Sequence, residues 1–305
     1  MTKITEPNPA SILARLRALG RTRYPNLPAN AMLLLYAQQG LLARLDASPY
    51  AERFVLKGAL SLFARFGQAA RPTEDLDFAS RGLPHTPEDV RAVLGEVCGL
   101  RFGDGLTFDA ATISVIPHQL GHAYPGVKAH VVARLGASRA DLKIDVSFGN
   151  AITPAPVVWT FPPLLLEQGV AVPIYPLETV VTEKFAALVE IGEATTRMKD
   201  LYDLHMILTR EALGARDTSL ALRRSFAARG TPAAAVPLVL DEAFGRSEVL
   251  TRRWNQYLAR TRFSAPPFEG IMALLRTFYR PLLMEGRDQG TWSPAAAHWQ
   301  DASGE

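Results

Sequence analysis

Two aspartates separated by one residue have the types and spacing to do chemistry. The stretch Asp75-Leu76-Asp77-Phe78 alternates acidic and apolar side chains, and alternate side chains of a strand point to opposite faces of a sheet. Asp75 and Asp77 should therefore project together from one face. Neighbouring carboxylates repel each other unless a cation lies between them, and their hard oxygen ligands suit Mg²⁺. The alternative is a solvated strand end, because Asp-x-Asp is common at protein surfaces.

A glycine upstream of this pair begins a segment that could bind phosphate. The apolar run at 54–56 predicts a short strand, and Gly58 opens a predicted amphipathic helix from Ala59 to Phe66, with Gly67 as its C-cap. Backbone N–H groups at a helix N-terminus bind phosphate with the help of the helix dipole. A phosphate cradle before two carboxylates is the layout of a nucleotidyltransferase. The candidate nucleotide-binding residues here are Lys57, Gly58, Ser61, Arg71 and Thr73.

A third carboxylate is predicted from the alternation between Asp141 and Phe148. Leu142, Ile144 and Val146 should share one face of a strand, and Asp145 should lie on the other face. We expect this strand to be an antiparallel neighbour of the Asp75–Asp77 strand, so that Asp145 approaches the pair as a metal ligand or as a general base. The alternative is a half-exposed sheet with a charged outer face.

The composition excludes several classes of protein. With 305 residues, of which 48% are hydrophobic and 21% charged, the chain is typical of a soluble globular protein with room for two domains. A net charge of +3 permits an anionic partner without requiring one. Cys98 is the single cysteine, which excludes a disulfide framework and a thiolate zinc site. Neither a signal peptide nor a long apolar run occurs, so we expect no membrane span and a cytoplasmic location.

The order of predicted elements indicates an α+β fold with two domains. We predict helices at 10–19 (ending at Gly20), 30–46 and 86–100, and strands at 112–116, 128–135 and 141–148. A proline-rich connection at 153–163 follows, and helical patterns dominate after it. Residues 1–160 are therefore expected to form a domain with a mixed or antiparallel sheet, and residues 161–305 a mostly helical domain with a loosely ordered tail from Gly286.

A lysine on an apolar helix face is the first candidate in the helical half. The pattern predicts a helix from Glu178 to Gly192, and Lys184 is spaced three or four residues from Val181 and Leu188. An inward-facing ammonium needs a negative partner, which a phosphate or the carboxylate cluster could provide. The alternative is a lysine at the rim whose ammonium reaches the solvent.

The following helix, from Thr196 to Leu208, carries more charged candidates. Lys199, Asp200 and Asp203 share one side of this helix, spaced three and four residues apart. Asp203 could act as a general base, or it could position a metal ion or a nucleotide. The alternative is a surface pair of Lys199 with Asp203, worth a few tenths of a kcal/mol.

Cations alternate with aromatic residues further along, between Arg252 and Arg262. Such a segment could bind nucleic acid through phosphate pairing and base stacking. The alternative is a helix that buries Trp254 and Tyr257 and leaves its arginines in the solvent.

Two stretches of the chain resemble a known family. The run YAQQGLLARLDASPYAERFVLKGALSLFARFG, followed by RPTEDLDF, is similar to the first motif of the AbiEii/AbiGii-type nucleotidyltransferase toxins. The run YPLETVVTEKFAALVEIGEATTRMKDLYDL is similar to their second conserved block. Together the matches cover roughly residues 36–208. The matching positions are Gly58, Asp75, Asp77, Lys184, Lys199, Asp200 and Asp203.

The resemblance implies a nucleotidyltransferase core and a helical domain with the site in the cleft between them. It implies Mg²⁺-dependent transfer of a nucleoside monophosphate from a nucleoside triphosphate, and neutralisation by a cognate antitoxin. Some relatives add pyrimidine nucleotides to the acceptor end of tRNA, which blocks translation, so RNA is the expected acceptor. The chain departs from its relatives at Ala59, where many carry serine or glycine, and at Glu74, an additional carboxylate.

The mechanism expected from these residues is electrostatic, without a covalent protein intermediate. Asp75 and Asp77 would hold Mg²⁺, and Asp145 would complete the metal site or accept the proton of the attacking hydroxyl. Lys184 would neutralise the leaving pyrophosphate, and Asp203 would orient the nucleotide or act as the base. The alternatives are transfer to a protein or a small molecule, and a non-catalytic nucleotide-binding module. The oligomeric state stays open, with a monomer favoured.

Overall fold

Two compact units make up the chain in the computed structural model, which describes residues 7–25, 27, 30–83, 85–120, 124–166 and 168–301. The first unit comprises residues 1–150 and 156–175, and the second comprises 151–155 and 176–305. The boundary expected at residue 160 falls inside strand β6 (Val157–Phe161). The first unit continues to Tyr175 because β6 pairs with β7 (Val170–Ile174), which joins the central sheet.

A seven-stranded mixed sheet forms the centre of the first unit, in the order β3-β4-β5-β2-β1-β7-β6. The other strands are β1 (Phe54–Lys57), β2 (Asp75–Ser80), β3 (Leu106–Leu120), β4 (Tyr124–Leu135) and β5 (Ser138–Phe148). The pairs β2–β5 and β1–β7 are parallel, and the other neighbouring pairs are antiparallel. The prediction of a mixed sheet is confirmed. Strand β3 is longer than the predicted 112–116 because it continues past an irregularity between Asp109 and Ser114.

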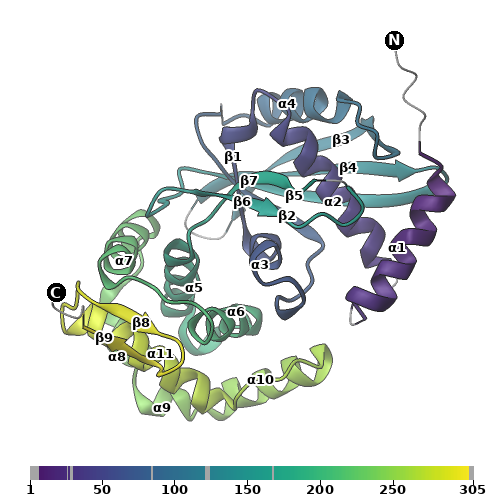
Figure 1. The fold of residues 1–305 in the computed structure, drawn as a ribbon. Helices are drawn as coiled ribbons and strands as arrows, with labels where there is room; N and C mark the ends of the chain where they lie inside the picture. The colour runs from purple at the N-terminus through teal and green to yellow at the C-terminus, as the bar shows by residue number, and fades with distance from the viewer. Residues whose placement is uncertain are drawn as a thin grey trace. The chain divides into compact units, whose positions relative to one another are not determined.

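Helices pack against this sheet (Figure 1). The helices of the first unit are α1 (Pro9–Arg23), α2 (Ala31–Asp46), α3 (Gly58–Phe66) and α4 (Pro87–Gly99), with 3-10 turns at Ala51–Arg53 and Gly67–Ala69. Helix α2 contacts β5 and β7, and α4 contacts β3. Leu76, Phe78, Ile144 and Val146 are at most 1% exposed. Alternation along the strands thus separates a buried apolar face from a polar one.

Most predicted helix ends are confirmed, but the stop at Gly20 is wrong. Gly67 is the C-cap of α3 with a φ of 55°, and the Thr86 hydroxyl accepts from the Asp89 N–H at 3.2 Å at the start of α4. Helix α1 instead continues through Gly20 to Arg23. A Cβ at residue 20 would lie 2.9 Å from Met32 Cγ on α2, so this glycine serves close helix packing rather than termination.

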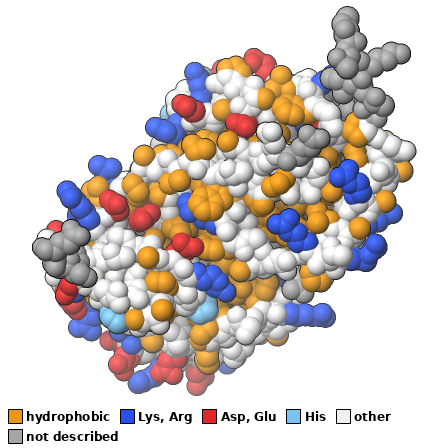
Figure 2. Space-filling model, in the orientation of Figure 1, with side chains coloured by type: hydrophobic (Ala, Val, Ile, Leu, Met, Phe, Trp, Pro, Cys, Tyr) orange, Lys and Arg blue, Asp and Glu red, His pale blue; other side chains and the backbone are white. Residues whose placement is uncertain are grey.

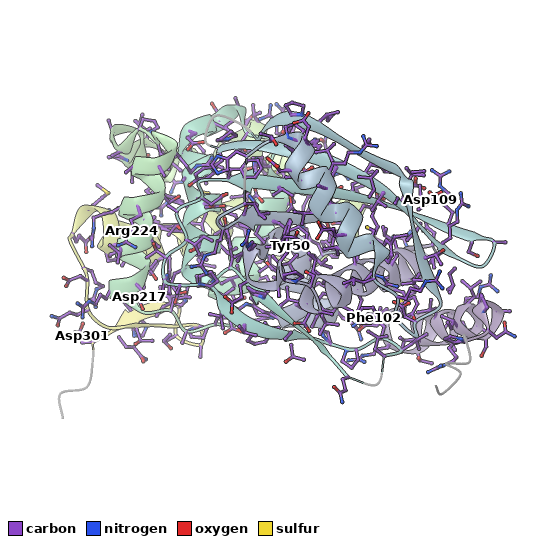
Figure 3. The ribbon with its side chains drawn as sticks, turned by 90° about the horizontal axis from the view of Figure 1, so that it is seen from above. Tyr50, Phe102, Asp109, Asp217, Arg224 and Asp301 are labelled. Atoms are coloured by element: carbon purple, nitrogen blue, oxygen red, sulfur yellow. The ribbon has the colours of Figure 1, made fainter. Side chains whose placement is uncertain are left out.

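A buried ion pair ties α2 to the start of β3. Arg44 and Asp104 are each 1% exposed, and the guanidinium donates to the carboxylate at 2.6 and 3.1 Å. The rings of Phe102 (labelled in Figure 3) and Phe108 cover the guanidinium at 5.1 and 4.7 Å. This geometry matches the cation–π contacts that arginine favours. The remaining hydrogen bonds of Arg44 go to the carbonyl oxygens of Gly40, Leu100 and Leu106.

The second unit is mostly helical, as predicted. Its helices are α5 (Leu177–Ile191), α6 (Met198–Leu208), α7 (Ala215–Arg229), α8 (Val236–Val239), α9 (Glu242–Gly245), α10 (Glu248–Thr261) and α11 (Phe268–Met284), with 3-10 turns at Gly192–Ala194 and Ala233–Ala235. Across the described residues, no helix combines the length and apolar character needed to cross a membrane.

The expectation of a loosely ordered tail from Gly286 is wrong for residues 286–301, and residues 302–305 lie outside the described residues. Strands β8 (Thr291–Ser293) and β9 (His298–Gln300) form a hairpin. Trp292 and Trp299 are 0% and 8% exposed, and their indole N–H groups donate to the carbonyl oxygens of Leu208 and Phe278. Burial of two large aromatic side chains holds this segment against α6 and α11.

Candidate active site

Four charged residues lie in one row across four strands of the first unit. Lys57 of β1 is opposite Asp77 of β2, Asp77 is opposite Asp145 of β5, and Asp145 is opposite Lys128 of β4. Residues opposite each other in a sheet project from the same face. Two lysines therefore flank two carboxylates on one face of the sheet. The antiparallel neighbour of β5 is β4, so the expectation that β5 runs antiparallel to the Asp75–Asp77 strand is wrong.

Asp75 adds a third carboxylate to this face, two residues before Asp77 and opposite Lys143. The structure thus brings all three predicted aspartates to one face, each partly buried. Burial raises the pKa of the Asp145 carboxyl above its usual value. The charge of Lys128 opposes this shift, and the charge of Asp75 adds to it. Asp145 consequently holds a proton more readily than an exposed aspartate.

Gly58 is required at the start of α3 for two reasons. Its φ is +66°, a conformation that side chains with a Cβ rarely adopt. A Cβ at this position would also overlap a carboxylate oxygen of Asp77. The Asp77 carboxylate therefore lies against the first residue of the helix, where the helix dipole favours negative charge.

Lys57 is oriented by residues that sequence analysis did not identify. Its ammonium donates to the hydroxyl of Ser147 on β5 at 2.7 Å. Ser147 is fully buried, and its hydroxyl lies 2.6 Å from the side-chain oxygen of Asn150. Ala79 is the residue of β2 opposite Ser147, and it is small enough to leave room for the lysine. Ser147 lies on the predicted polar face of its strand, which is the signal that could have identified it.

The other predicted nucleotide-binding residues of this unit, Ser61, Thr73 and Arg71, lie in the helix and loop next to the row of charged residues. Ser61 is 1% exposed, and its hydroxyl donates to the Gly58 carbonyl oxygen at 2.8 Å within α3. Thr73 accepts from the Asp75 N–H at 3.2 Å, which positions the start of β2. Arg71 is half-buried in the preceding loop. The exposed Glu74 carboxylate forms an ion pair with Lys143 at 3.1 Å.

The second unit contains a buried ion cluster. The Lys184 ammonium on α5 donates to the carboxylates of Asp200 and Asp203 on α6, both at 2.7 Å. The exposed fractions of the three side chains are 11%, 7% and 0%. The inward-facing lysine thus has carboxylate partners within its own unit. Lys199 is exposed, and Asp203 is buried rather than part of a surface pair.

Asp200 is also held by Arg197, which donates to the same carboxylate. Burial alone would raise the pKa of Asp200, but the charges of Lys184 and Arg197 hold the pKa of that carboxyl well below its usual range. The Asp200 carboxylate therefore stays ionised at neutral pH. Its hydrogen bonds fix the orientation of Lys184 against α6.

The oxygen ligands of the first unit fit a Mg²⁺ ion only in part. Among the described residues, no group of three or more histidine, cysteine, aspartate or glutamate side chains is arranged to hold a metal ion. The carboxylates of Asp75, Asp77 and Asp145 are hard donors of the right type, and Mg²⁺ usually takes one or two carboxylates together with substrate phosphates and water. These carboxylates therefore fit an ion that is also ligated by the phosphates of a bound triphosphate, rather than an ion ligated by protein groups alone.

A groove opens on the same face of the sheet, beside Asp145. Its volume is about 250 Å³. The lining residues come from β2, β3, β4 and β5, and they are Asp75, Ser114, Ile116, Lys128, Ala129, His130, Lys143 and Asp145. The groove places basic side chains next to two of the three site carboxylates.

The cationic segment of α10 buries its aromatic residues, as the alternative expects, but Arg253 is half-buried and donates to the carbonyl oxygens of Glu193 and Thr195. Trp254 and Tyr257 are buried at 0% and 7% exposure, so neither offers a face for base stacking. Arg252 and Arg260 are exposed. Figure 2 shows side chains of both charge signs distributed over the visible surface.

Comparisons with known proteins identify the family of the chain. Two solved structures from Helicobacter pylori resemble the fold, each over 85% of this chain: JHP933, with 15% identity over 94% of its own length, and a protein described as a candidate nucleotidyltransferase, with 16% identity over 97%. The TM-score is 0.47 in both cases. No curated protein sequence matches the chain. Residues 40–277 match the family described as nucleotidyl transferase AbiEii toxin, type IV toxin–antitoxin system, and because this match spans most of the sequence, the chain belongs to that family of nucleotidyltransferase toxins.

Proposed function

We propose that this nucleotidyltransferase toxin transfers a nucleoside monophosphate from a nucleoside triphosphate to RNA, at the acceptor end of tRNA, with Mg²⁺ as cofactor. Its action in the cytoplasm would block translation until a cognate antitoxin neutralises it, and the protein would act as a monomer. The observation that carries the proposal is the row of Lys57, Asp77, Asp145 and Lys128 across one sheet face. Such a row supplies carboxylates for an ion and cations for phosphates on either side.

The triphosphate would bind at the β1–α3 side of the row. The backbone at the start of α3 and the ammonium of Lys57 both favour negative charge there, and the positive φ of Gly58 keeps this turn free of a side chain. Asp75 and Asp77 would hold Mg²⁺, which when bound neutralises charge on the triphosphate and on the leaving pyrophosphate. Ser61 has no direct part in this proposal, because its hydroxyl is engaged inside the helix.

Asp145 would accept the proton of the attacking hydroxyl. Its carboxylate lies opposite Asp77 in the register, and its raised pKa suits a group that takes up a proton during the reaction. The acceptor oxygen forms a bond to the α-phosphorus, the bond from that phosphorus to the bridging oxygen breaks, and pyrophosphate leaves. In this assignment Asp145 acts as the base, whereas Asp75 and Asp77 supply the protein ligands of the ion.

The second unit would contribute through its family motif. We assign Lys184, Lys199, Asp200 and Asp203 to nucleotide recognition, and a pyrimidine nucleotide is the substrate expected from the family resemblance. The hydrogen bonds of Lys184 to Asp200 and Asp203 support a positioning role for this cluster, since they fix all three side chains.

Labelling of deproteinised cellular RNA tests the proposal. The protein is incubated with Mg²⁺ and each nucleoside triphosphate in turn, radiolabelled at the α-phosphate, beside the variant Asp77→Ala. We expect label in RNA, loss of labelling with chelator, and loss in Asp77→Ala. The matched control is Asp109→Ala, which removes a half-buried aspartate from β3 of the same sheet (labelled in Figure 3).

The acceptor class is tested in the same assay. Label found in added proteins or small molecules but not in RNA would reject RNA as the acceptor. Full RNA labelling by a folded Asp77→Ala variant, as judged by circular dichroism, would reject the assignment of the carboxylates.

A further inference from the structure

The groove beside Asp145 lies apart from the start of α3, where the triphosphate is proposed to bind. In the register, Lys57 and Lys128 lie on opposite sides of the Asp77–Asp145 pair. The start of α3 follows Lys57 directly, so the proposed phosphate cradle lies on that side. The groove of about 250 Å³ lies on the Lys128 side. The Lys57 ammonium reaches across β2 to Ser147 on β5, two residues beyond Asp145, whereas Lys128 lies opposite Asp145 on β4. One sheet face therefore offers two separate cationic positions.

The geometry of phosphoryl transfer needs two such positions. The attacking and leaving oxygens are roughly in line on opposite sides of the phosphorus. If pyrophosphate leaves towards Lys57 and the start of α3, the attacking hydroxyl must arrive from the side of Lys128. On the Lys128 side, the groove is a hollow that could admit this hydroxyl.

The charges of the groove suit an anionic strand. Lys128 is exposed and lies directly opposite Asp145. Lys143 forms an ion pair with Glu74, but the two side chains are 58% and 73% exposed. Exposed pairs of this kind contribute little, so a phosphate could replace Glu74 at small cost. Ile116 is 59% exposed beside these cations and offers an apolar surface for a ribose or the face of a base.

The size of the groove limits what can enter it. Drug-sized ligands typically occupy pockets of roughly 300–1,000 Å³, and this groove is slightly smaller. It is suited to one terminal nucleotide rather than to a duplex.

We infer that the groove binds the hydroxyl-bearing end of a single-stranded RNA acceptor and that Lys128 is a positioning residue for the phosphodiester next to that hydroxyl. The inference rests on the proposed function and adds the site at which the acceptor binds. In the step itself, the terminal hydroxyl oxygen forms a bond to the α-phosphorus, pyrophosphate departs towards Lys57, and the hydroxyl proton passes to Asp145. Lys128 takes no proton and makes no covalent bond.

Steady-state kinetics with Lys128 variants test this inference. The variants are Lys128→Gln and Lys128→Arg, assayed with deproteinised tRNA and the nucleoside triphosphate that labels it. The matched control is Arg91→Gln, which removes an exposed cation of α4 that does not line the groove. Nucleotide affinity is measured separately, without RNA, by calorimetry.

We expect Lys128→Gln to raise the KM for tRNA about tenfold, the equivalent of one charge-assisted hydrogen bond. The salt dependence of tRNA binding should lose about one unit of slope. Nucleotide affinity should stay unchanged, Lys128→Arg should retain most of the function, and Arg91→Gln should behave as the unaltered protein.

The possible results distinguish a failure of the acceptor groove from a failure of the proposed RNA nucleotidyl transfer. If the unaltered protein labels no RNA, the proposed function fails, and the acceptor groove fails with it. If it labels RNA and Lys128→Gln leaves both the KM for tRNA and the salt slope unchanged, only the acceptor groove is rejected. A loss of nucleotide affinity in Lys128→Gln, with an unchanged KM for tRNA, would place the triphosphate in the groove instead and would also reject the inference.

Discussion

The Asp77 carboxylate lies against the Cα of Gly58, so closely that any side chain at residue 58 would overlap it. This contact joins the two halves of the proposed nucleotide site, because Gly58 begins α3 and Asp77 belongs to the carboxylate row. The Asp77 carboxylate can thus keep this position only because residue 58 has no Cβ.

Gly58→Ala should therefore abolish nucleotidyl transfer because it displaces the Asp77 carboxylate, and not only because it destabilises the fold. An alanine at positive φ costs about 1–2 kcal/mol, and here its Cβ must also displace Asp77. The control is Gly67→Ala, at the other end of α3, where φ is +55° and a Cβ would meet nothing within 4 Å. We expect Gly67→Ala to lose only the free energy of unfolding that the positive φ costs and Gly58→Ala to lose more, with labelling lost only in Gly58→Ala. Equal labelling by the two variants would contradict a functional role for the contact.

The dependence of the rate on pH should identify the role of Asp145. A general base must be deprotonated, and burial raises the pKa of this carboxyl. The rate should therefore increase with pH across a midpoint above the roughly 3.9 of an ordinary aspartate. If Asp145 were instead a metal ligand, Mg²⁺ would compete with the proton, and a tenfold increase in Mg²⁺ would lower the midpoint. We expect no such shift, and observing one would reassign Asp145 to the ion.

Alternation along the strands predicts which aspartates share a face, but it does not predict their neighbours. A period of two places Asp75 and Asp77 together and separates Asp145 from Ile144, and the structure shows these faces. Strand order depends on contacts between distant segments, so the parallel pairing of β2 with β5 is not visible in either strand alone. For the same reason Lys128 was not identified, although it lies on a predicted strand.

The errors in the C-terminal segment and at Gly20 have local causes. The strands of the β8–β9 hairpin have three residues each, too few for alternation to show. Trp292 and Trp299 were the available signal, because two tryptophans near a chain end are seldom left in solvent. Gly20 looked like a helix stop, and only the packing of Met32 against it shows its purpose.

Acid should weaken the second unit through Asp200. The folded-state pKa of this carboxyl is lowered, so its contribution to stability is present above the unfolded value of about 3.9 and is lost as the pH falls below it. We expect the free energy of unfolding of the unaltered protein to decrease more steeply below pH 4 than that of Asp200→Asn. At pH 7 the variant should be about 2 kcal/mol less stable, since Lys184 keeps Asp203 as a partner. Parallel pH profiles in urea would contradict this account.

The ion pair of Arg44 with Asp104 should contribute to stability only while both partners are present. Both side chains are 1% exposed, so Asp104→Ala leaves a buried guanidinium without its carboxylate, at a cost of about 3–5 kcal/mol. The double variant Arg44→Met with Asp104→Ala should recover part of that loss, because no charge remains buried. The pair of Arg134 with Asp109, at 3.9 Å and with side chains 47% and 35% exposed, is the control, and Asp109→Ala should change stability by less than about 1 kcal/mol. Urea unfolding measures all four proteins. A double variant less stable than Asp104→Ala would show that Arg44 acts mainly through its contacts with Phe102 and Phe108 and its hydrogen bonds to backbone carbonyls.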